Sequence, residues 1–388
     1  HKDRSMHRTA FSLDSVFAPW PRLQRAGRRL VPRAFLAAAA AVVSILPLQA
    51  ARAVTITMVT VGNPNNAADT NGRGAVAAAY QIGANEVTIG QYVDFLNAVA
   101  TTSAETIYDS NINTADSARG ISRTGDGSGT PYFYAATIAA NSGGQSAANR
   151  PVTFVNWYSA VRFANWLANG QPTTGTQTAS TTENGAYDLT GGPTSTVALN
   201  SINPNTSAAP LFALPTLDQW YKAAYYSPTL NGGAGGYYAF PTQSNTAPGN
   251  TVGGSANQAN HVVGGSYAVT GAAFASNQNY LTDVAAFSGS ASYYGTFDQG
   301  GNTGEWYDPG SGQANSGILG GAWNLNNGGS SSFNISTPIG TANYDTGFRV
   351  VAPVPEPSAC LLSVASLAAL RYRWWRARGP KVAAGQAG

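Results

Sequence analysis

Residues 300–306 read Gly-Gly-Asn-Thr-Gly-Glu-Trp, and two related motifs follow: Gly-Gly-Ala-Trp at 320–323 and Thr-Gly-Phe-Arg-Val at 346–350. Glycines placed this densely around large aromatic residues are typical of tight turns between short strands. The first motif lacks the lysine of a phosphate-binding loop and opens no helical pattern. From residue 293 onward the sequence therefore predicts small strands joined by turns.

Upstream of these motifs, three segments carry the signals of capped helices. Thr88 and Thr216 each precede a glutamine by three residues, which is the spacing of a capping box, and Asn156 is expected to cap the helix between them. Apolar residues recur at helical spacing after each cap: Ile89, Tyr92, Val93, Leu96 and Val99; Ala160, Val161, Ala164 and Leu167; Trp220, Ala223 and Ala224. The alternating segment 54–61 predicts a first strand.

The order of these segments is a stronger signal than any one of them. The segments are 85–96, 150–167, 214–224, 300–306, 320–323 and 346–350. In this order they resemble the formylglycine-generating enzyme family, also called the sulfatase-modifying factor domain, over about residues 80–352. The resemblance implies a single α+β domain of the C-type-lectin-like class, with short helices, short strands and extensive ordered coil, over residues 54–353.

Tryptophan accounts for much of the expected core. Because an indole buries a large area and its N–H needs a partner, we expect these residues to pack inside the domain: Trp157, Trp166, Trp220, Trp306 and Trp323.

The charges of the 388-residue chain are segregated, which its net charge of +3 conceals. Fourteen of the 21 Lys and Arg residues lie before residue 54 or after residue 370, whereas the body from 54 to 355 holds seven basic and fifteen acidic residues. A body with a net charge of −8 repels a phosphate backbone, so nucleic acid is excluded as a partner.

Cysteine and histidine are too scarce for most chemistry that depends on them. Cys360 is the single cysteine, and His261 is the single histidine of the body. Disulfides within the chain, thiolate–zinc sites and cysteine–histidine dyads are therefore excluded. His261 lies in a polar run and is expected at the surface.

The N-terminal region has the three parts of a secretory signal peptide. Arginines precede an apolar run at 34–48, and the small residues Ala51 and Ala53 follow it. The run is about 15 residues long and interrupted by Pro47, so it is shorter than the ~20 residues of a membrane-spanning helix. We expect residues 1–53 to be a signal peptide region, with cleavage after Ala53, and the protein to be exported.

The C-terminal region, 354–388, has a second three-part pattern. Val354, Pro355, Glu356, Pro357 and Ser358 are followed by an apolar run at 359–370 and a basic cluster at 371–378. This resembles the PEP-CTERM sorting signal of bacterial exported proteins. The resemblance implies the export machinery and an exosortase as partners. It also implies a location at the cell surface, in association with the outer membrane or in the extracellular matrix.

The resemblance also bears on copper. Enzymes of this family oxidise a sulfatase cysteine to formylglycine, using copper held by two cysteines shortly after a Gly-Gly-Ser-Trp-like motif. Here the corresponding positions fall near Leu325 and Ser330. Neither residue supplies the soft thiolate that Cu(I) prefers, and the Arg-rich stretch that usually follows is absent. Copper is therefore not expected, and no catalytic residue is assigned.

Calcium is the metal that the resemblance favours. Family members hold structural Ca²⁺ in the loop that leads to the Gly-Asn-x-x-Glu-Trp motif. In this chain the carboxylates of Asp298 and Glu305 and the carbonyls of Gly301 and Thr303 would supply hard oxygen ligands. The alternative is that these residues form a solvated acidic loop.

Two functions of different classes remain, and a spacer without a specific ligand is a third. The first is a non-catalytic exported module that binds extracellular polysaccharide or another surface protein, with the Tyr- and Gly-rich loops 235–240 and 292–294 as its contact face. The second is an enzyme of the same fold that modifies a sulfatase or another protein without copper-thiolate chemistry. The missing thiolates favour the first.

Overall fold

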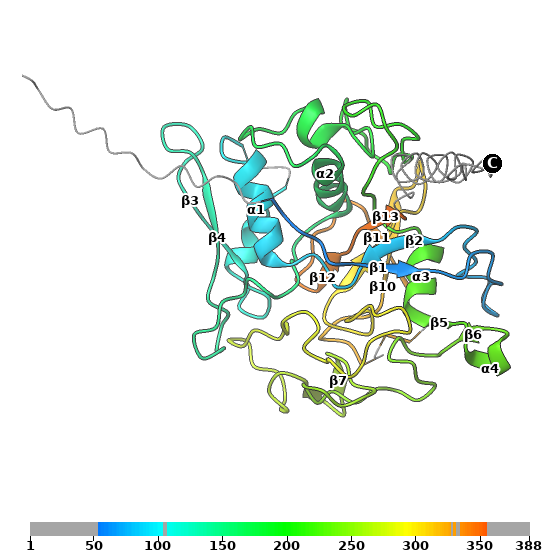
Figure 1. Cartoon of the computed structure of the whole chain (residues 1–388). Coiled ribbons are helices and arrows are strands. Elements are labelled where there is room, and N and C mark those ends of the chain that lie inside the picture. Colours follow the sequence, from blue (N-terminus) through cyan, green and yellow to red (C-terminus); the bar gives the residue numbers. More distant parts are fainter. Residues whose placement is uncertain (1–52, 104–106, 327–328, 331–333, 355–388) are drawn as a thin grey trace, which may run out of the picture. The chain divides into compact units, whose positions relative to one another are not determined.

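Regular secondary structure is sparse in this chain, and coil connects short elements (Figure 1). The computed structural model describes residues 53–103, 107–326, 329–330 and 334–354. The helices are α1 (Ile89–Val99), α2 (Trp157–Ala168), α3 (Leu217–Tyr225) and the short α4 (Leu230–Gly233), with a 3₁₀ turn at Ser110–Asn113 and a π turn at Ala179–Glu183. Within these ranges no helix has the length and apolar character needed to cross a membrane.

The three predicted helices and their caps are confirmed. In both predicted capping boxes the threonine Oγ1 accepts from the glutamine backbone N–H, and the glutamine Oε1 accepts from the threonine N–H at 2.9 Å. Asn156 Oδ1 caps α2 by accepting from Ser159 N at 2.8 Å. Local sequence alone therefore sets where each of these helices begins.

Two small sheets lie at the middle of the fold (Figure 1). One is antiparallel in the order β1 (Met58–Val61), β2 (Tyr80–Gly83), β13 (Val351–Pro353). The other has the order β11 (Asn334–Pro338), β10 (Asn315–Leu319), β9 (Gly304–Trp306), β12 (Thr346–Phe348), with β12 parallel to β9. Three two-stranded pairs complete the set: β3 (Ile121–Thr124) with β4 (Phe133–Ala136), β5 (Tyr226–Ser227) with β6 (Gly236–Tyr237), and β7 (Val262–Val263) with β8 (Ser266–Tyr267). This mixture confirms the expected α+β class.

The predicted first strand is shorter than its alternating pattern. It begins at Met58, and Val54 at the start of the pattern bonds a side chain instead of a strand. Val54 donates its N–H to Gln171 Oε1 at 2.6 Å and accepts from Gln171 Nε2 at 2.9 Å. A side-chain amide thus takes the bonds that a neighbouring strand would have made.

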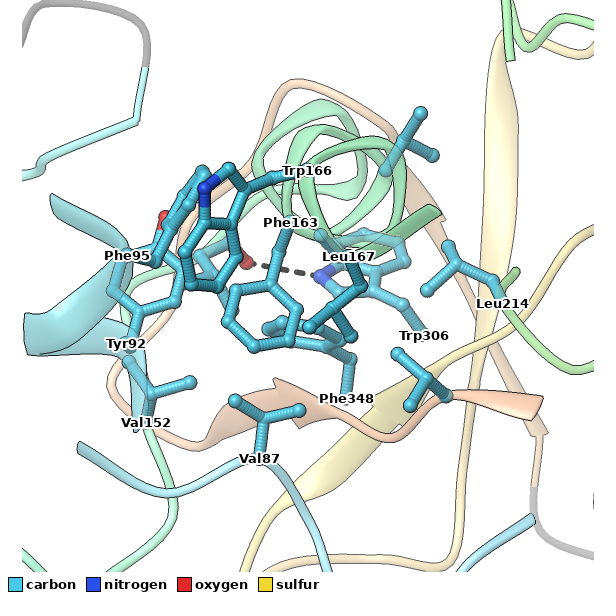
Figure 2. Packing of buried hydrophobic residues seen from close by; sticks show 14 of the residues in the cluster. Val87, Tyr92, Phe95, Val152, Phe163, Trp166, Leu167, Leu214, Trp306 and Phe348 are labelled. Atoms are coloured by element: carbon cyan, nitrogen blue, oxygen red, sulfur yellow. Dashed lines mark hydrogen bonds between the residues drawn. The ribbon is translucent and has the colours of Figure 1, made fainter. Parts of the chain in front are cut away.

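An aromatic core joins α1, α2 and the sheet (Figure 2). Phe95 of α1 lies 5.3 Å from Phe163 of α2, whose ring lies 5.4 Å from Phe348 of β12, both edge to face. Trp306 of β9 donates its indole N–H to the Val155 carbonyl at 2.9 Å, the dashed bond of Figure 2. Edge-to-face packing and a satisfied indole are what a buried aromatic cluster requires.

The burial of the tryptophans is confirmed, whereas the expected exposure of His261 is wrong. All five tryptophans named above are buried. His261 is only 3% exposed, and its Nε2 lies 3.0 Å from the Pro248 carbonyl. The polar run around His261 pairs with other loops instead of with water, since Val262 N donates to the Leu325 carbonyl at 2.8 Å.

Candidate functional site

A fully buried ion pair joins Glu305 of β9 to Arg349, which also bonds the other sheet at Gly83. Arg349, next to β12, donates from Nε to Glu305 Oε2 at 2.5 Å and from Nη2 to Oε1 at 2.6 Å. Its remaining donors reach the carbonyls of Gly83 and Phe297, both at 2.9 Å. Trp220 Nε1 also donates to Glu305 Oε2, at 2.8 Å. A buried pair of this kind is stable only because every polar atom is satisfied.

Two more carboxylates lie within electrostatic reach of this pair. Glu86 Oε1 accepts from Thr303 Oγ1 at 3.1 Å, and Glu86 Oε2 has no partner among the described residues. Asp298 Oδ2 accepts from Ala285 N at 2.6 Å. Burial raises the pKa of Glu86 well above its usual range and the pKa of Asp298 to about 6, and neighbouring carboxylates add to both shifts. Arg349 opposes both shifts.

The predicted calcium ligands therefore have different surroundings. The Glu305 carboxylate is paired with Arg349 and also accepts a hydrogen bond from Trp220. With these partners its oxygens are not free to bind calcium. Asp298 has one carboxylate oxygen bonded to a backbone N–H. Among the described residues no three His, Cys, Asp or Glu side chains are arranged to hold a metal ion. The calcium site of Asp298, Gly301, Thr303 and Glu305 stays a prediction, in which the Glu305 carboxylate would have to exchange its bonds with Arg349 and Trp220 for the ion.

Asn302 organises the loops around the site, a role that the sequence analysis missed. Its Oδ1 accepts from Asn260 Nδ2 at 2.9 Å and from Thr282 N at 3.1 Å, and its carbonyl accepts from Trp323 N at 3.0 Å. Its φ of 61° lies in the left-handed region that asparagine tolerates better than most residues. An asparagine amid the glycines of the 300–306 motif was the signal for this role.

The Gly-Gly-Ala-Trp turn after β10 leads into a small cavity of about 90 Å³. Gly320 has a φ of 88°, and a Cβ there would lie 2.7 Å from the Gln299 carbonyl, so the turn requires glycine. Aliphatic side chains of Ile318, Leu325 and Ile335 line the cavity. Leu325 occupies a position where the resemblance implies a cysteine, so the donors present do not fit copper.

Beside this cavity, aromatic rings from three segments surround Trp323. Its indole stacks on Tyr280 with a centroid distance of 5.1 Å and an interplanar angle of 9°. Phe274 stacks on the same Tyr280 ring at 5.5 Å, while Tyr267 and Tyr344 lie 5.9 and 5.7 Å from Trp323. Phe274 and Tyr344 are half-exposed. We call these five residues the Trp323 cluster.

The Trp323 cluster also contains unpaired polar atoms. Trp323 Nε1 is buried and finds no acceptor among the described residues, and the neighbouring Asn324 Oδ1 finds no donor there. Asn324 Nδ2 does donate to Asp345 Oδ2, at 2.9 Å. Buried polar atoms without partners are uncommon and costly, so each of these two atoms would gain a hydrogen bond from a suitable ligand.

The predicted contact loops behave differently from one another. Tyr237 of loop 235–240 packs on Tyr221 and Tyr226, and its hydroxyl donates to the Gly74 carbonyl at 2.8 Å. The Tyr237 side chain therefore makes its contacts inside the domain. Tyr293 of loop 292–294 is exposed.

The residues predicted for signal-peptide cleavage and C-terminal sorting lie at or beyond the two ends of the described residues. Ala53 and Val354 are exposed at its two ends, whereas Ala51 and the motif residues 355–358 lie outside the described residues.

The short helices and strands joined by long coil agree with the class that the motif order indicated. A domain model described as "Sulfatase-modifying factor enzyme 1-like domain" matches residues 49–354. The chain belongs to this family, and the predicted fold class is confirmed.

Several solved structures are similar, and none of the curated proteins matches. The crystal structure of CarF is 20% identical with a TM-score of 0.44, covering 78% of this chain and 99% of that one. Treponema denticola variable protein 1 is 17% identical with a TM-score of 0.46, covering 79% and 98%. PvdO from Pseudomonas aeruginosa is 15% identical with a TM-score of 0.38, covering 77% and 92%.

Proposed function

We propose that this protein is a non-catalytic recognition module that binds polysaccharide through the Trp323 cluster. The observation that carries the proposal is the unpaired indole N–H of Trp323, with the unpaired Asn324 Oδ1 on the next residue, in a group of aromatic rings whose outer members are half-exposed. A sugar hydroxyl both donates and accepts, so sugar hydroxyls can serve an indole N–H and an amide oxygen alike.

The aromatic rings suit the apolar faces of sugars. The face of an aromatic ring carries partial negative charge, and the C–H groups of a pyranose face carry partial positive charge, so the two attract when they stack. Phe274 offers such a face next to Tyr280. In the adjacent cavity Leu325 supports recognition over oxidation, because an aliphatic group cannot hold copper.

The test measures binding of the protein to soluble neutral and acidic polysaccharides, with Phe274→Ala as the main variant and Phe133→Ala as its control. The two phenylalanines are equally exposed, at 52% and 51%, and Phe133 lies on β4 outside the cluster. We expect Phe274→Ala to weaken binding at least tenfold and Phe133→Ala to leave it unchanged. Equal effects of the two variants, or binding of a protein ligand in place of any polysaccharide, would contradict the proposal.

We also propose that the protein is exported and then sorted through its C-terminal segment. The support is the sequence of residues 1–53 and 354–388 alone. N-terminal sequencing of the mature protein tests the first part, and we expect it to begin at Val54. Retention of the arginines that precede the apolar run would contradict it.

A further inference from the structure

A second cavity, lined by none of the residues of the Trp323 cluster, has the properties of a small-molecule site. It has a volume of about 420 Å³ and lies where β2, β13 and the N-terminal end of α3 meet the loops around residues 200 and 210. Its walls are largely apolar: Val76, Leu199, Pro210, Leu214, Val351 and Pro353. Ligand pockets are typically ~300–1,000 Å³, apolar, with a few polar groups.

One of the residues that line this groove is an acid, Asp308. It is 9% exposed, and its Oδ1 accepts from Gly310 N at 2.8 Å. Its Oδ2 accepts from the Tyr187 hydroxyl at 3.0 Å, and that hydroxyl itself accepts from Leu214 N at 3.2 Å. Both carboxylate oxygens therefore accept hydrogen bonds, as an ionised carboxylate does.

No cation balances this carboxylate among the described residues, where the ion pairs involve other acids. Burial raises the pKa of Asp308, and the bonds from Gly310 and Tyr187 hold it down. A buried charge is costly unless it is paired. The groove thus places an unpaired negative group beside hydrocarbon walls.

The groove continues into exposed apolar side chains. Leu199 lines it and is half-exposed, and the neighbouring Ile202, Leu211 and Val354 are exposed as well. A ligand in the groove would therefore cover hydrocarbon on several walls and meet one acid, Asp308.

We propose that this groove binds a small amphipathic cation, a primary alkylammonium, with its ammonium group at Asp308 and its hydrocarbon chain against Leu199 and the apolar walls. The ammonium supplies the missing positive charge and three N–H donors. The chain gains affinity with length, by about three- to fourfold for each buried methylene. This site is separate from the proposed polysaccharide site, and neither proposal depends on the other.

Three probes of one chain length test the proposal by calorimetric titration into the full chain: hexylammonium, hexanol and hexanoate. We expect hexylammonium to bind at least tenfold tighter than hexanol, and hexanoate to bind weakest. In Asp308→Asn we expect hexylammonium to fall to the affinity of hexanol, which itself stays unchanged. Equal affinities for the ammonium and the carboxylate, or no binding of any probe, would overturn the proposal.

A surface variant keeps the test decisive if Asp308→Asn unfolds. Leu199→Ser alters the apolar wall at a residue that is 48% exposed, and Val252→Ser is its control at a residue that is 46% exposed and outside the groove. We expect the first variant to weaken hexylammonium binding at least threefold and the second to leave it unchanged. Equal affinities in both variants would place the binding elsewhere and refute the site.

Discussion

Replacing Arg349 with methionine should destabilise the domain more than any change to its partner Glu305. Arg349 makes five hydrogen bonds, two to Glu305 and three to the carbonyls of Gly83, Ala84 and Phe297. Its charge also faces two other buried carboxylates, which share its electrostatic field. Methionine fills a similar volume but leaves all three carboxylates without this cation.

The size of the effect follows from the geometry. Removing one partner of a buried ion pair costs about 3–5 kcal/mol, and domain stabilities are about 5–15 kcal/mol. We expect Arg349→Met to lower the free energy of unfolding by about 5 kcal/mol, the upper end of the cost of breaking a buried ion pair. Glu305→Gln leaves Arg349 still facing Glu86 and Asp298, so we expect it to cost about 2 kcal/mol less. Arg162→Met is the control, because Arg162 forms the same two-pronged pair with Glu183 nearer the surface.

Urea unfolding followed by tryptophan fluorescence measures these differences at pH 7 and pH 5. An acid whose pKa is raised by folding destabilises the fold as the pH rises through that pKa. Asp298, with a pKa of about 6, and Glu86 are of this kind. Lowering the pH from 7 to 5 should therefore restore part of the free energy of unfolding that Arg349→Met loses relative to the wild type. It should restore none of the free energy of unfolding that Arg162→Met loses. The reasoning is refuted if Glu305→Gln costs as much as Arg349→Met, or if the loss is the same at both pH values.

Three further outcomes are expected. Burial lowers the pKa of Lys222 to about 8, so the stability of the wild type relative to Lys222→Met should rise between pH 8 and 9.5 in pH-dependent denaturation, a comparison that cancels the opposite effect of the buried tyrosines. Asn302→Ala removes the acceptor for Asn260 and should cost about 2–4 kcal/mol in the same assay; a loss below 1 kcal/mol would contradict its organising role. If calcium binds, EDTA should lower the melting temperature in wild type but not in Asp298→Asn, whereas an unchanged melting temperature in wild type would contradict calcium binding.

The helices were predictable because their signals are local. Thr88, Asn156 and Thr216 fix three helix starts through side chains only three residues from their partners. The burial of His261 and the late start of β1 were not predictable. Both depend on partners far away in the sequence, such as Gln171, which bonds Val54 across 117 positions. The pattern of neighbouring residues does not predict contacts between residues so far apart in the sequence.

The residues of the site divide in the same way, into those that the fold requires and those that it does not. The Glu305–Arg349 pair, the Asn302 contacts and the Gly320 turn are all satisfied from within the chain, so folding alone requires them. Those three features do not explain why residue 325 is a leucine, where the resemblance implies a cysteine. They also do not explain why the buried indole N–H of Trp323 has no acceptor among the described residues. Residues that the fold does not require are the residues on which selection for a ligand can act. Their chemistry here is aromatic and hydrogen-bonding, which suits a hydroxylated ligand.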